Sequence, residues 1–311
     1  MSLAPQSPDR FNQIKESALV IVDQADQNFY TLSDTANHLI AGDALVVMKK
    51  LPSESVDLIF IDPPYFLQLT TKKLNRWKVG DVVQGVHDEW DQFPSNLAYD
   101  EFLKEVLCEA QRLMKPSATL WAIATYHNLF RVGKIMQDLG FWFLNDVVWV
   151  KPNPMPNWLR VRFTNATETL IWALRDRHSH GYTFDKDQAR DFGVGSIGAN
   201  VWVIPTCTGK ERLRDHARRR IHSTQKPLEL MRRIILCSSH EGDVVLDPMA
   251  GVGTTGYAAR MLNRQFIMIE TNPNYVQATI ERFHQSGYIQ SAMSEKRRRQ
   301  YSIYLKAKKS D

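Results

Sequence analysis

The stretch VVLDPMAGVGTTGYAA, residues 244–259, has the pattern of a buried strand, a glycine-rich turn and a helix. Its apolar start ends in Asp247 and a proline. Gly251 and Gly253 then let the backbone turn tightly, because neither carries a side chain. The free amide groups of the following helix face whatever occupies the turn. The stretch therefore predicts a strand–turn–helix unit in which a ligand can approach the main chain closely.

The next strand adds an acidic residue to this turn. QFIMIE, residues 265–270, ends in Glu270 roughly twenty residues past the glycines, where a carboxylate can accept hydrogen bonds from both hydroxyls of a ribose. The turn lacks the GxGxxG spacing of dinucleotide sites, and no P-loop lysine accompanies it. The glycine pattern alone also fits a plain connection. Together the two motifs indicate a site for a nucleoside-containing cofactor.

Strand-like and helix-like segments alternate along most of the chain from His38 onward. Such alternation predicts a mostly parallel sheet with helices on both faces, in which ligands bind at the carboxyl ends of strands. The β-rich runs NDVVWVK and ETLIWAL, separated by a Pro/Asn segment, predict a hairpin. Expected strands cover 38–45, 56–61, 118–125, 145–151, 168–174, 243–248 and 265–270, and expected helices cover 100–114, 130–139, 227–238 and two segments ending near 50 and 262.

The composition is that of an ordinary globular protein. Of the 311 residues 43% are hydrophobic and 23% charged, and no segment approaches the roughly 18 consecutive apolar residues of a membrane helix. The N-terminal residues lack the basic flank and apolar core of a secretory signal, which favours a cytoplasmic location. Cys108, Cys207 and Cys237 have no spacing typical of a zinc or redox motif, so we expect buried thiols and no metal site.

Positive charge is clustered although its total is modest. The net charge is +5, but residues 210–222 and 294–300 concentrate Lys and Arg. Two long segments without clear periodicity, 66–99 and 176–221, also carry basic and aromatic residues. These clusters favour a polyanionic partner such as nucleic acid, while a solvated surface accounts for any single residue equally well. Candidate contacts are Lys72, Lys73, Arg76 and Trp77 in the first segment and Arg212, Arg214, Arg218, Arg219 and Arg220 in the second.

A further stretch, IDPPYF at residues 61–66, concentrates hydrogen-bond acceptors at the end of another strand. Prolines supply no amide donors, so the backbone carbonyls of Asp62 and Pro63 can point outward beside the Asp62 carboxylate. Such acceptors suit a planar amino group with two hydrogens, and Tyr65 can stack on the ring that carries it. The alternative is a simple turn with Tyr65 packed on the core. The nucleoside-site motif in the same chain favours the amino-group site.

These motifs, in this order, resemble those of the permuted β group of S-adenosylmethionine-dependent DNA amino-methyltransferases. In that group DPPY precedes the target-recognition region and the glycine-rich motif comes last, as at 62–65 and 247–255 here. The segment HSTQKPLELMRRII (222–235) is similar to the family's HxTxKP element. The segments DQFPSNLAYDEF, YHNLFRVGKIMQDLGFWFLNDVVWVKPNPMPN and RFTNATETLIWA are similar to cell-cycle-regulated adenine methyltransferases of the GANTC type. Two features differ: Phe66 stands where those relatives commonly have Asn, and their extra C-terminal DNA-binding domain has no counterpart.

The resemblance implies a Rossmann-like α/β methyltransferase fold: a mostly parallel seven-stranded sheet with a β-hairpin, helices on both faces and inserted DNA-recognition loops. It implies a catalytic domain over 38–285 between an N-terminal extension (1–37) and a basic C-terminal tail (286–311). Within that domain it assigns a mobile DNA-facing loop to 66–99 and a target-recognition insertion to 176–221. It also implies S-adenosylmethionine as cofactor and double-stranded DNA, not a membrane, as partner. A homodimer and a cognate restriction endonuclease are the further partners that it raises.

The implied activity is site-specific methylation of the N6 amino group of adenine in duplex DNA, after the base is flipped out of the helix. Hydrogen bonds to Asp62 and to the Pro63 carbonyl would localise the lone pair of the amino nitrogen for direct transfer, and Tyr65 would stack on the base. The expected catalytic residues are Asp62, Pro63, Pro64 and Tyr65. The expected cofactor-binding residues are Asp43, Ala44, Asp247, Pro248, Ala250, Gly251, Gly253, Thr254, Thr255, Glu270, Asn272, His222, Thr224 and Lys226.

Several alternatives remain at this point. Asp43 also fits a helix N-cap. Cytosine-N4 methylation uses the same geometry, although the cytosine enzymes more often have Ser in place of Asp62. Methylation of a glutamine amide is usually associated with Asn at that position and with the unpermuted order. A non-catalytic DNA-binding protein with a methyltransferase fold is the alternative from another class, and the intact motifs speak against it.

Overall fold

The strand that carries the DPPY motif lies inside a single sheet. In the computed structural model, which describes residues 20–23, 37–67, 91–157, 160–194 and 198–284, β3 (Val56–Ile61) pairs in parallel with β8 (Val244–Asp247) and with β4 (Met114–Ala124). Ile59 lies opposite Leu246, so the DPPY motif and the glycine-rich motif leave the same edge of the sheet from neighbouring strands.

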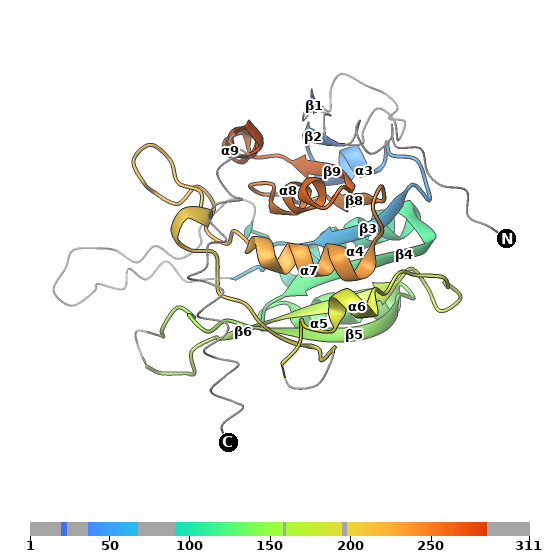
Figure 1. The fold of residues 1–311 in the computed structure, drawn as a ribbon, viewed down its shortest axis with the longest axis horizontal. Helices are drawn as coiled ribbons and strands as arrows, with labels where there is room; N and C mark the ends of the chain where they lie inside the picture. The colour runs from blue at the N-terminus through green and yellow to red at the C-terminus, as the bar shows by residue number, and fades with distance from the viewer. Residues whose placement is uncertain (1–19, 24–36, 68–90, 158–159, 195–197, 285–311) are drawn as a thin grey trace.

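The sheet has the order β1-β2-β9-β8-β3-β4-β6-β5-β7 (Figure 1). Neighbouring strands are parallel except at β4–β6 and β6–β5, where the predicted hairpin runs antiparallel. This confirms the predicted fold class. The remaining strands are β1 (Val20–Asp23), β2 (His38–Ala41), β5 (Trp142–Val150), β6 (Thr167–Leu174), β7 (Val201–Val203) and β9 (Gln265–Glu270).

The described residues form nine strands, two more than the seven expected from the resemblance. The additional strands are at the two edges of the sheet. β1 comes from the segment assigned to an N-terminal extension and pairs with β2, while β7 comes from within the 176–221 segment and pairs with β5. The sequence has a short β-like run at 18–22, but a local pattern does not give the strand with which it pairs, and the three residues of β7 are too few to show a period.

Helices cover both faces of the sheet (Figure 1). Buried residues of α3 (Ala44–Met48), α4 (Asn96–Leu113) and α5 (Leu129–Asp138) form one core with Ile59 and Ile61. Leu58 and Phe60 point the other way, into the core that covers the opposite face. A strand buried on both faces explains the continuous apolar run of β3. The second core is contributed by α6 (Lys186–Ala189), α7 (Leu228–Ser238), α8 (Thr254–Met261) and α9 (Pro273–His284).

Some local expectations need correction. Helix α4 begins at Asn96, four residues before the predicted start at 100, because Ser95 Oγ accepts a hydrogen bond from the amide of Ala98 and caps the helix. Cys108 is exposed on the polar face of α4, against the expectation of three buried thiols. Among the described residues, no helix is long and apolar enough to cross a membrane.

Candidate active site

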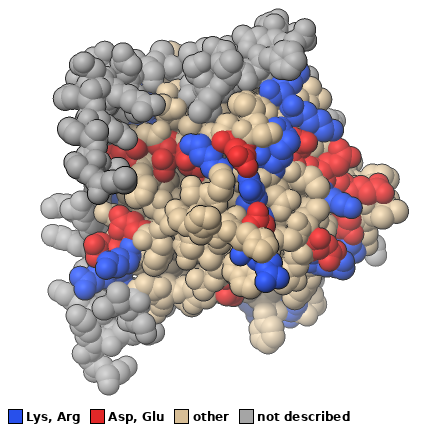
Figure 2. Space-filling model, turned by 90° about the vertical axis from the view of Figure 1, so that its right-hand side faces the viewer, with Lys and Arg blue, Asp and Glu red and all other residues tan. Residues whose placement is uncertain are grey.

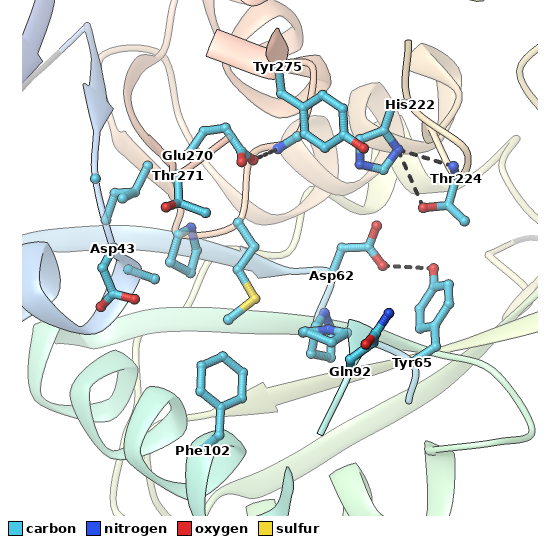
Figure 3. Close-up of a pocket in the computed structure, with 18 of the residues that line it drawn as sticks. Asp43, Asp62, Tyr65, Gln92, Phe102, His222, Thr224, Glu270, Thr271 and Tyr275 are labelled. Carbon is cyan, nitrogen blue, oxygen red and sulfur yellow. Dashed lines mark hydrogen bonds between the residues drawn. The ribbon is translucent and has the colours of Figure 1, made fainter. Parts of the chain in front are cut away.

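Four carboxylates meet at the carboxyl edge of the sheet because the strands that carry them are neighbours. Asp43 follows β2, Glu270 ends β9, Asp247 ends β8 and Asp62 follows β3. Asp43, Glu270 and Asp62 line a cavity of about 330 Å³ (Figure 3). Asp247 lines a smaller adjoining cavity, which also contains Asp62 in its wall. The edge therefore has the position expected of a ligand site in a parallel α/β sheet.

Glu270 holds the glycine-rich turn through the backbone. Its Oε2 accepts a hydrogen bond from the amide of Gly251 at 2.7 Å, and its Oε1 accepts one from the amide of Asn272 at 2.7 Å. Burial raises the pKa of Glu270 to about 7, although these amides oppose the rise. At neutral pH the carboxyl is thus close to the midpoint of its titration.

Gly251 is required for two separate reasons. Its φ of 53° lies in the left-handed region, which residues with a side chain rarely adopt. A Cβ at this position would also lie 3.0 Å from Nε2 of His222. A side chain at this position would strain the backbone and press on His222, so the turn favours glycine where it passes the HSTQKP segment.

His222 is a neutral residue of the cavity wall. Burial, together with the charges of Lys226 and Arg212, lowers the pKa of His222 to about 3. Its Nδ1 accepts a hydrogen bond from the amide of Thr224 at 3.1 Å, and its ring lies 4.6 Å from the ring of Tyr275 (Figure 3). At physiological pH the site thus has an uncharged imidazole beside the glycine turn.

Asp62 is the centre of a buried polar cluster. Its Oδ1 accepts a hydrogen bond from the Tyr65 hydroxyl at 2.8 Å, and its Oδ2 accepts one from Lys226 Nζ at 2.6 Å. Lys226 Nζ also contacts the Tyr65 hydroxyl and lies 5.0 Å from the centre of the Tyr65 ring. Burial raises the pKa of Asp62, and the Lys226 ammonium opposes this rise.

The two proline carbonyls have different surroundings. The Pro64 carbonyl accepts hydrogen bonds from the Tyr99 hydroxyl at 2.8 Å and from Asn128 Nδ2 at 3.3 Å. No residue that the structure describes donates to the Pro63 carbonyl, and Pro63 lines the cavity. Pro64 is therefore fixed by the core, while the Pro63 carbonyl keeps its acceptor capacity.

Asp247 is held by the turn that follows it. Its Oδ2 accepts a hydrogen bond from the Thr255 hydroxyl at 2.6 Å, and its Oδ1 accepts one from the amide of Met249 at 3.1 Å. Burial raises the pKa of Asp247 to about 7, and the charges of Asp62 and Glu270 act in the same direction. The negative charge that these carboxylates can carry is well placed for a bound cation.

Most of the predicted residues are brought together. The larger cavity is lined by Asp43, Ala44, Asp62, Pro63, Pro64, Tyr65, His222, Thr224, Pro248, Gly251 and Glu270. The smaller cavity adds Lys226, Asp247, Ala250, Thr254 and Thr255.

Of the predicted catalytic and cofactor-binding residues, two line neither cavity. Gly253 (φ 71°) packs against Thr279, and Asn272 Oδ1 accepts a hydrogen bond from the amide of Asn274. Asp43 caps α3, accepting a hydrogen bond from the amide of Val46 at 3.0 Å, which confirms the N-cap interpretation; it also lines the larger cavity, so its contact with a cofactor stays a prediction.

Sequence reasoning missed a group of mostly apolar residues in the same cavity. Several lie inside segments quoted above, such as Met249 in the glycine-rich motif and Ile269 in QFIMIE, but a motif does not show which of its apolar side chains face a ligand, so only the fold identifies them. The missed lining residues are Gly42, Gln92, Phe93, Phe102, Met249, Ile269, Thr271 and Tyr275.

The predicted DNA-contacting residues do not all lie at the surface. Arg212 points inward, where its guanidinium donates to the carbonyls of Cys207, His222 and Ser223. Arg214, Arg218, Arg219 and Arg220 are exposed on a tight turn closed by an antiparallel bridge between Arg214 and Arg220. Lys72, Lys73, Arg76 and Trp77 lie outside the described residues.

On the face shown in Figure 2, basic and acidic side chains are interspersed and do not form a field of one sign. This face therefore does not have the uniform positive charge expected of a surface that follows a phosphate backbone.

Comparison with known proteins gives consistent results. A family model described as DNA methylase (N6_N4_Mtase) matches residues 56–281. The chain is 42% identical over 254 residues to type II methyltransferase M.HinfI of Haemophilus influenzae, covering 82% of this chain and 70% of that protein. It is 33% identical over 279 residues to type II methyltransferase M2.MboI of Moraxella bovis, covering 88% and 97%. The solved M1.HpyAVI–SAM complex is 25% identical with a TM-score of 0.56, covering 78% of this chain and 97% of that one.

Proposed function

Because this chain belongs to the N6/N4 DNA methylase family, whose members use S-adenosylmethionine, we propose that it methylates the N6 amino group of adenine at a specific site in duplex DNA. The observation that carries this proposal is the acceptor cluster of Asp62 and the Pro63 carbonyl, which borders the cavity at the carboxyl edge of the sheet. The DPPY order and the similarity to GANTC-type adenine enzymes favour adenine over cytosine.

The residues of the larger cavity fit S-adenosylmethionine. Glu270 would bind the ribose hydroxyls and Asp43 the adenine end of the cofactor, which is supported by the cavity wall that both share with the Gly251 turn. The carboxylates of Asp62 and Asp247 suit a sulfonium cation. When bound, this cofactor supplies an electrophilic methyl group. His222, Thr224 and Tyr275, which line the same cavity, would hold its methionine end.

The proposed chemistry requires alignment more than acid–base catalysis. An adenine amino nitrogen is a poor nucleophile because its lone pair is delocalised into the ring. Two hydrogen bonds donated by that amino group, one to Asp62 and one to the Pro63 carbonyl, would favour a tetrahedral nitrogen with a localised lone pair. Holding this nitrogen in line with the methyl group lowers the barrier entropically.

The target base would enter beside aromatic side chains. A base inside a duplex must be flipped out before its amino group can reach Asp62. Tyr65, Phe93 and Phe102 line the cavity and can contact a flipped ring. The exposed basic turn at 214–220 and the 66–99 segment are the proposed contacts to the DNA backbone.

Sequencing of methylated DNA tests the proposal. The protein is incubated with duplex DNA and S-adenosylmethionine, and the modified base and its sequence context are identified. N6-methyladenine in one defined context is the expected result. N4-methylcytosine would replace the proposal with the cytosine activity. Asp62→Ala should reduce transfer by at least roughly a hundredfold, as loss of an aligned polar contact does, while calorimetry still detects cofactor binding.

A further inference from the structure

The β5–β6 hairpin brings a second carboxylate to the cluster around Asp62. Strand β6 runs antiparallel to β4, so its first residues lie at the edge of the sheet where β3 and β4 end. Glu168 is near the start of β6, and Lys151 directly follows β5. Lys151 Nζ donates to Glu168 Oε1 at 3.0 Å. Lys151 ends the NDVVWVK run and Glu168 begins the ETLIWAL run, but neither was among the predicted site residues.

Only one oxygen of the Glu168 carboxylate has a hydrogen-bond partner among the described residues. The other, Oε2, is buried and lies 4.0 Å from Lys226 Nζ, beyond hydrogen-bonding distance. The Glu168 side chain is 12% exposed and the Lys226 side chain 7%. A buried carboxylate oxygen without a donor is unfavourable, so Oε2 is a ready acceptor for a group that moves toward it.

The Lys226 ammonium lies between two carboxylates and is bonded to one of them. It donates to Asp62 Oδ2 at 2.6 Å and contacts the Tyr65 hydroxyl. If Asp62 is to accept a hydrogen bond from a target amino group, as proposed above, the ammonium competes for the same carboxylate. A small displacement of Nζ toward Glu168 Oε2 would relieve this competition while keeping the positive charge paired.

We propose that Glu168 is a positioning residue for methyl transfer, which acts through Lys226 by sharing its ammonium with Asp62. Lys151 fixes Glu168 through the other oxygen, so that Oε2 stays directed at Lys226. The inference rests on the proposed function of Asp62 and adds a residue from a separate part of the chain. It involves no covalent step.

The charges around Asp62 give this role a signature in the pH profile. The charge of Glu168 raises the pKa of Asp62, and the charge of Lys226 lowers it. Removing the Glu168 charge should therefore move the acid limb of the rate profile to lower pH, and removing the Lys226 charge should move it to higher pH. Among the described residues, the other titratable groups that face the cluster are Tyr65, Asp247, Lys151, Asp91 and His222.

The test is the pH profile of methyl transfer to duplex DNA at saturating cofactor and DNA, with Glu168→Gln and Lys226→Met. For Glu168→Gln we expect a rate roughly ten- to hundredfold lower, as for a misplaced reacting group, and an acid limb at lower pH. For Lys226→Met we expect an acid limb at higher pH. The dissociation constant for S-adenosylmethionine, measured by calorimetry, should change less than about twofold for Glu168→Gln, since Glu168 lies outside both cavity walls.

Asp57→Asn provides a matched control. Asp57 is a 16%-exposed carboxylate paired with Lys115 at the opposite end of β3, so its loss should lower stability without moving the acid limb. A Glu168→Gln protein with the wild-type rate and profile, or one that loses only stability, would overturn the inference. A wild-type protein that transfers no methyl group to DNA would instead count against the proposed function.

Discussion

Asp91 holds the residue that follows the DPPY motif, because its Oδ1 accepts a hydrogen bond from the amide of Phe66 at 2.7 Å. Its Oδ2 accepts a second from the amide of Leu67 at 3.0 Å. Phe66 has a φ of 50°, in the region that Asn tolerates better than other residues with side chains. Its ring stacks on Tyr99 at 5.5 Å between centroids. The aromatic contact and the Asp91 carboxylate thus hold Phe66 in a backbone conformation that residues with side chains rarely adopt.

Asp91→Ala should therefore disturb the DPPY segment. It leaves two partly buried amides without their acceptor, and the free energy of unfolding should fall by about 1–3 kcal/mol. The rate of methyl transfer should fall as well, because Tyr65 directly precedes the released residue. Chemical denaturation and a labelled-methyl assay measure the two effects. Asp138→Ala, at an exposed ion pair of α5, is the control and should change neither by a comparable amount.

Gly251→Ala should weaken cofactor binding. The added Cβ meets His222 at 3.0 Å and is strained at a φ of 53°, so the turn must move away from the cavity. Calorimetry with S-adenosylmethionine should show a dissociation constant at least about tenfold higher, equivalent to about 1.4 kcal/mol.

Gly140→Ala is the control for backbone strain alone. Gly140 has a φ of 85°, and no atom lies within 4 Å of the added Cβ. It should lower stability and leave the dissociation constant unchanged. Equal dissociation constants for Gly251→Ala and the wild type would show that the turn does not contact the cofactor.

Cofactor affinity should depend on pH through Glu270. Its pKa of about 7 in the free protein means that the carboxyl is mostly protonated at pH 6 and mostly ionised at pH 8. Ribose hydroxyls donate to the ionised form, so binding must release the proton, and affinity should be about tenfold weaker at pH 6 than at pH 8. Calorimetry in buffers of different ionisation enthalpy would detect the proton release.

Glu270→Gln supplies the control for this titration. The amide cannot ionise, so affinity should be low at both pH values and the proton release should decrease. An affinity that is the same at pH 6 and pH 8 in the wild type would exclude Glu270 as the acceptor for the ribose.

The exposed basic turn should contribute to DNA affinity and to its salt dependence. Arg218→Ser combined with Arg220→Ser removes two exposed cations, and each lost phosphate contact should reduce the slope of log affinity against log salt by about 0.9. Lys49→Ser with Lys134→Ser, at exposed sites on other elements, removes the same charge. Filter binding between 50 and 200 mM salt, a range chosen for its roughly linear response, compares them. Equal slopes for the two double variants would show that the DNA does not contact this turn.

The sequence by itself determined the α/β alternation, the hairpin and the strand ends that carry Asp62, Asp247 and Glu270. These features are local: a short apolar run bounded by turn residues is typical of a strand buried on both faces, and the glycine-rich turn joins a strand and a helix that are consecutive in the sequence. At the edges of the sheet, β1 overlaps a short β-like run at 18–22 whose pairing no local pattern gives, and the three residues of β7 show no pattern of their own.

Only the tertiary structure decided which charges meet. Lys226, expected at the cofactor, donates to Asp62 across 164 residues of sequence, and Arg212, expected at DNA, is turned inward onto carbonyl groups. Glu168 and Lys151 join the site because the hairpin reverses the direction of β6 beside β4. Sequence patterns report which face of an element is buried, whereas contacts between distant residues depend on strand order and direction, which no local pattern encodes.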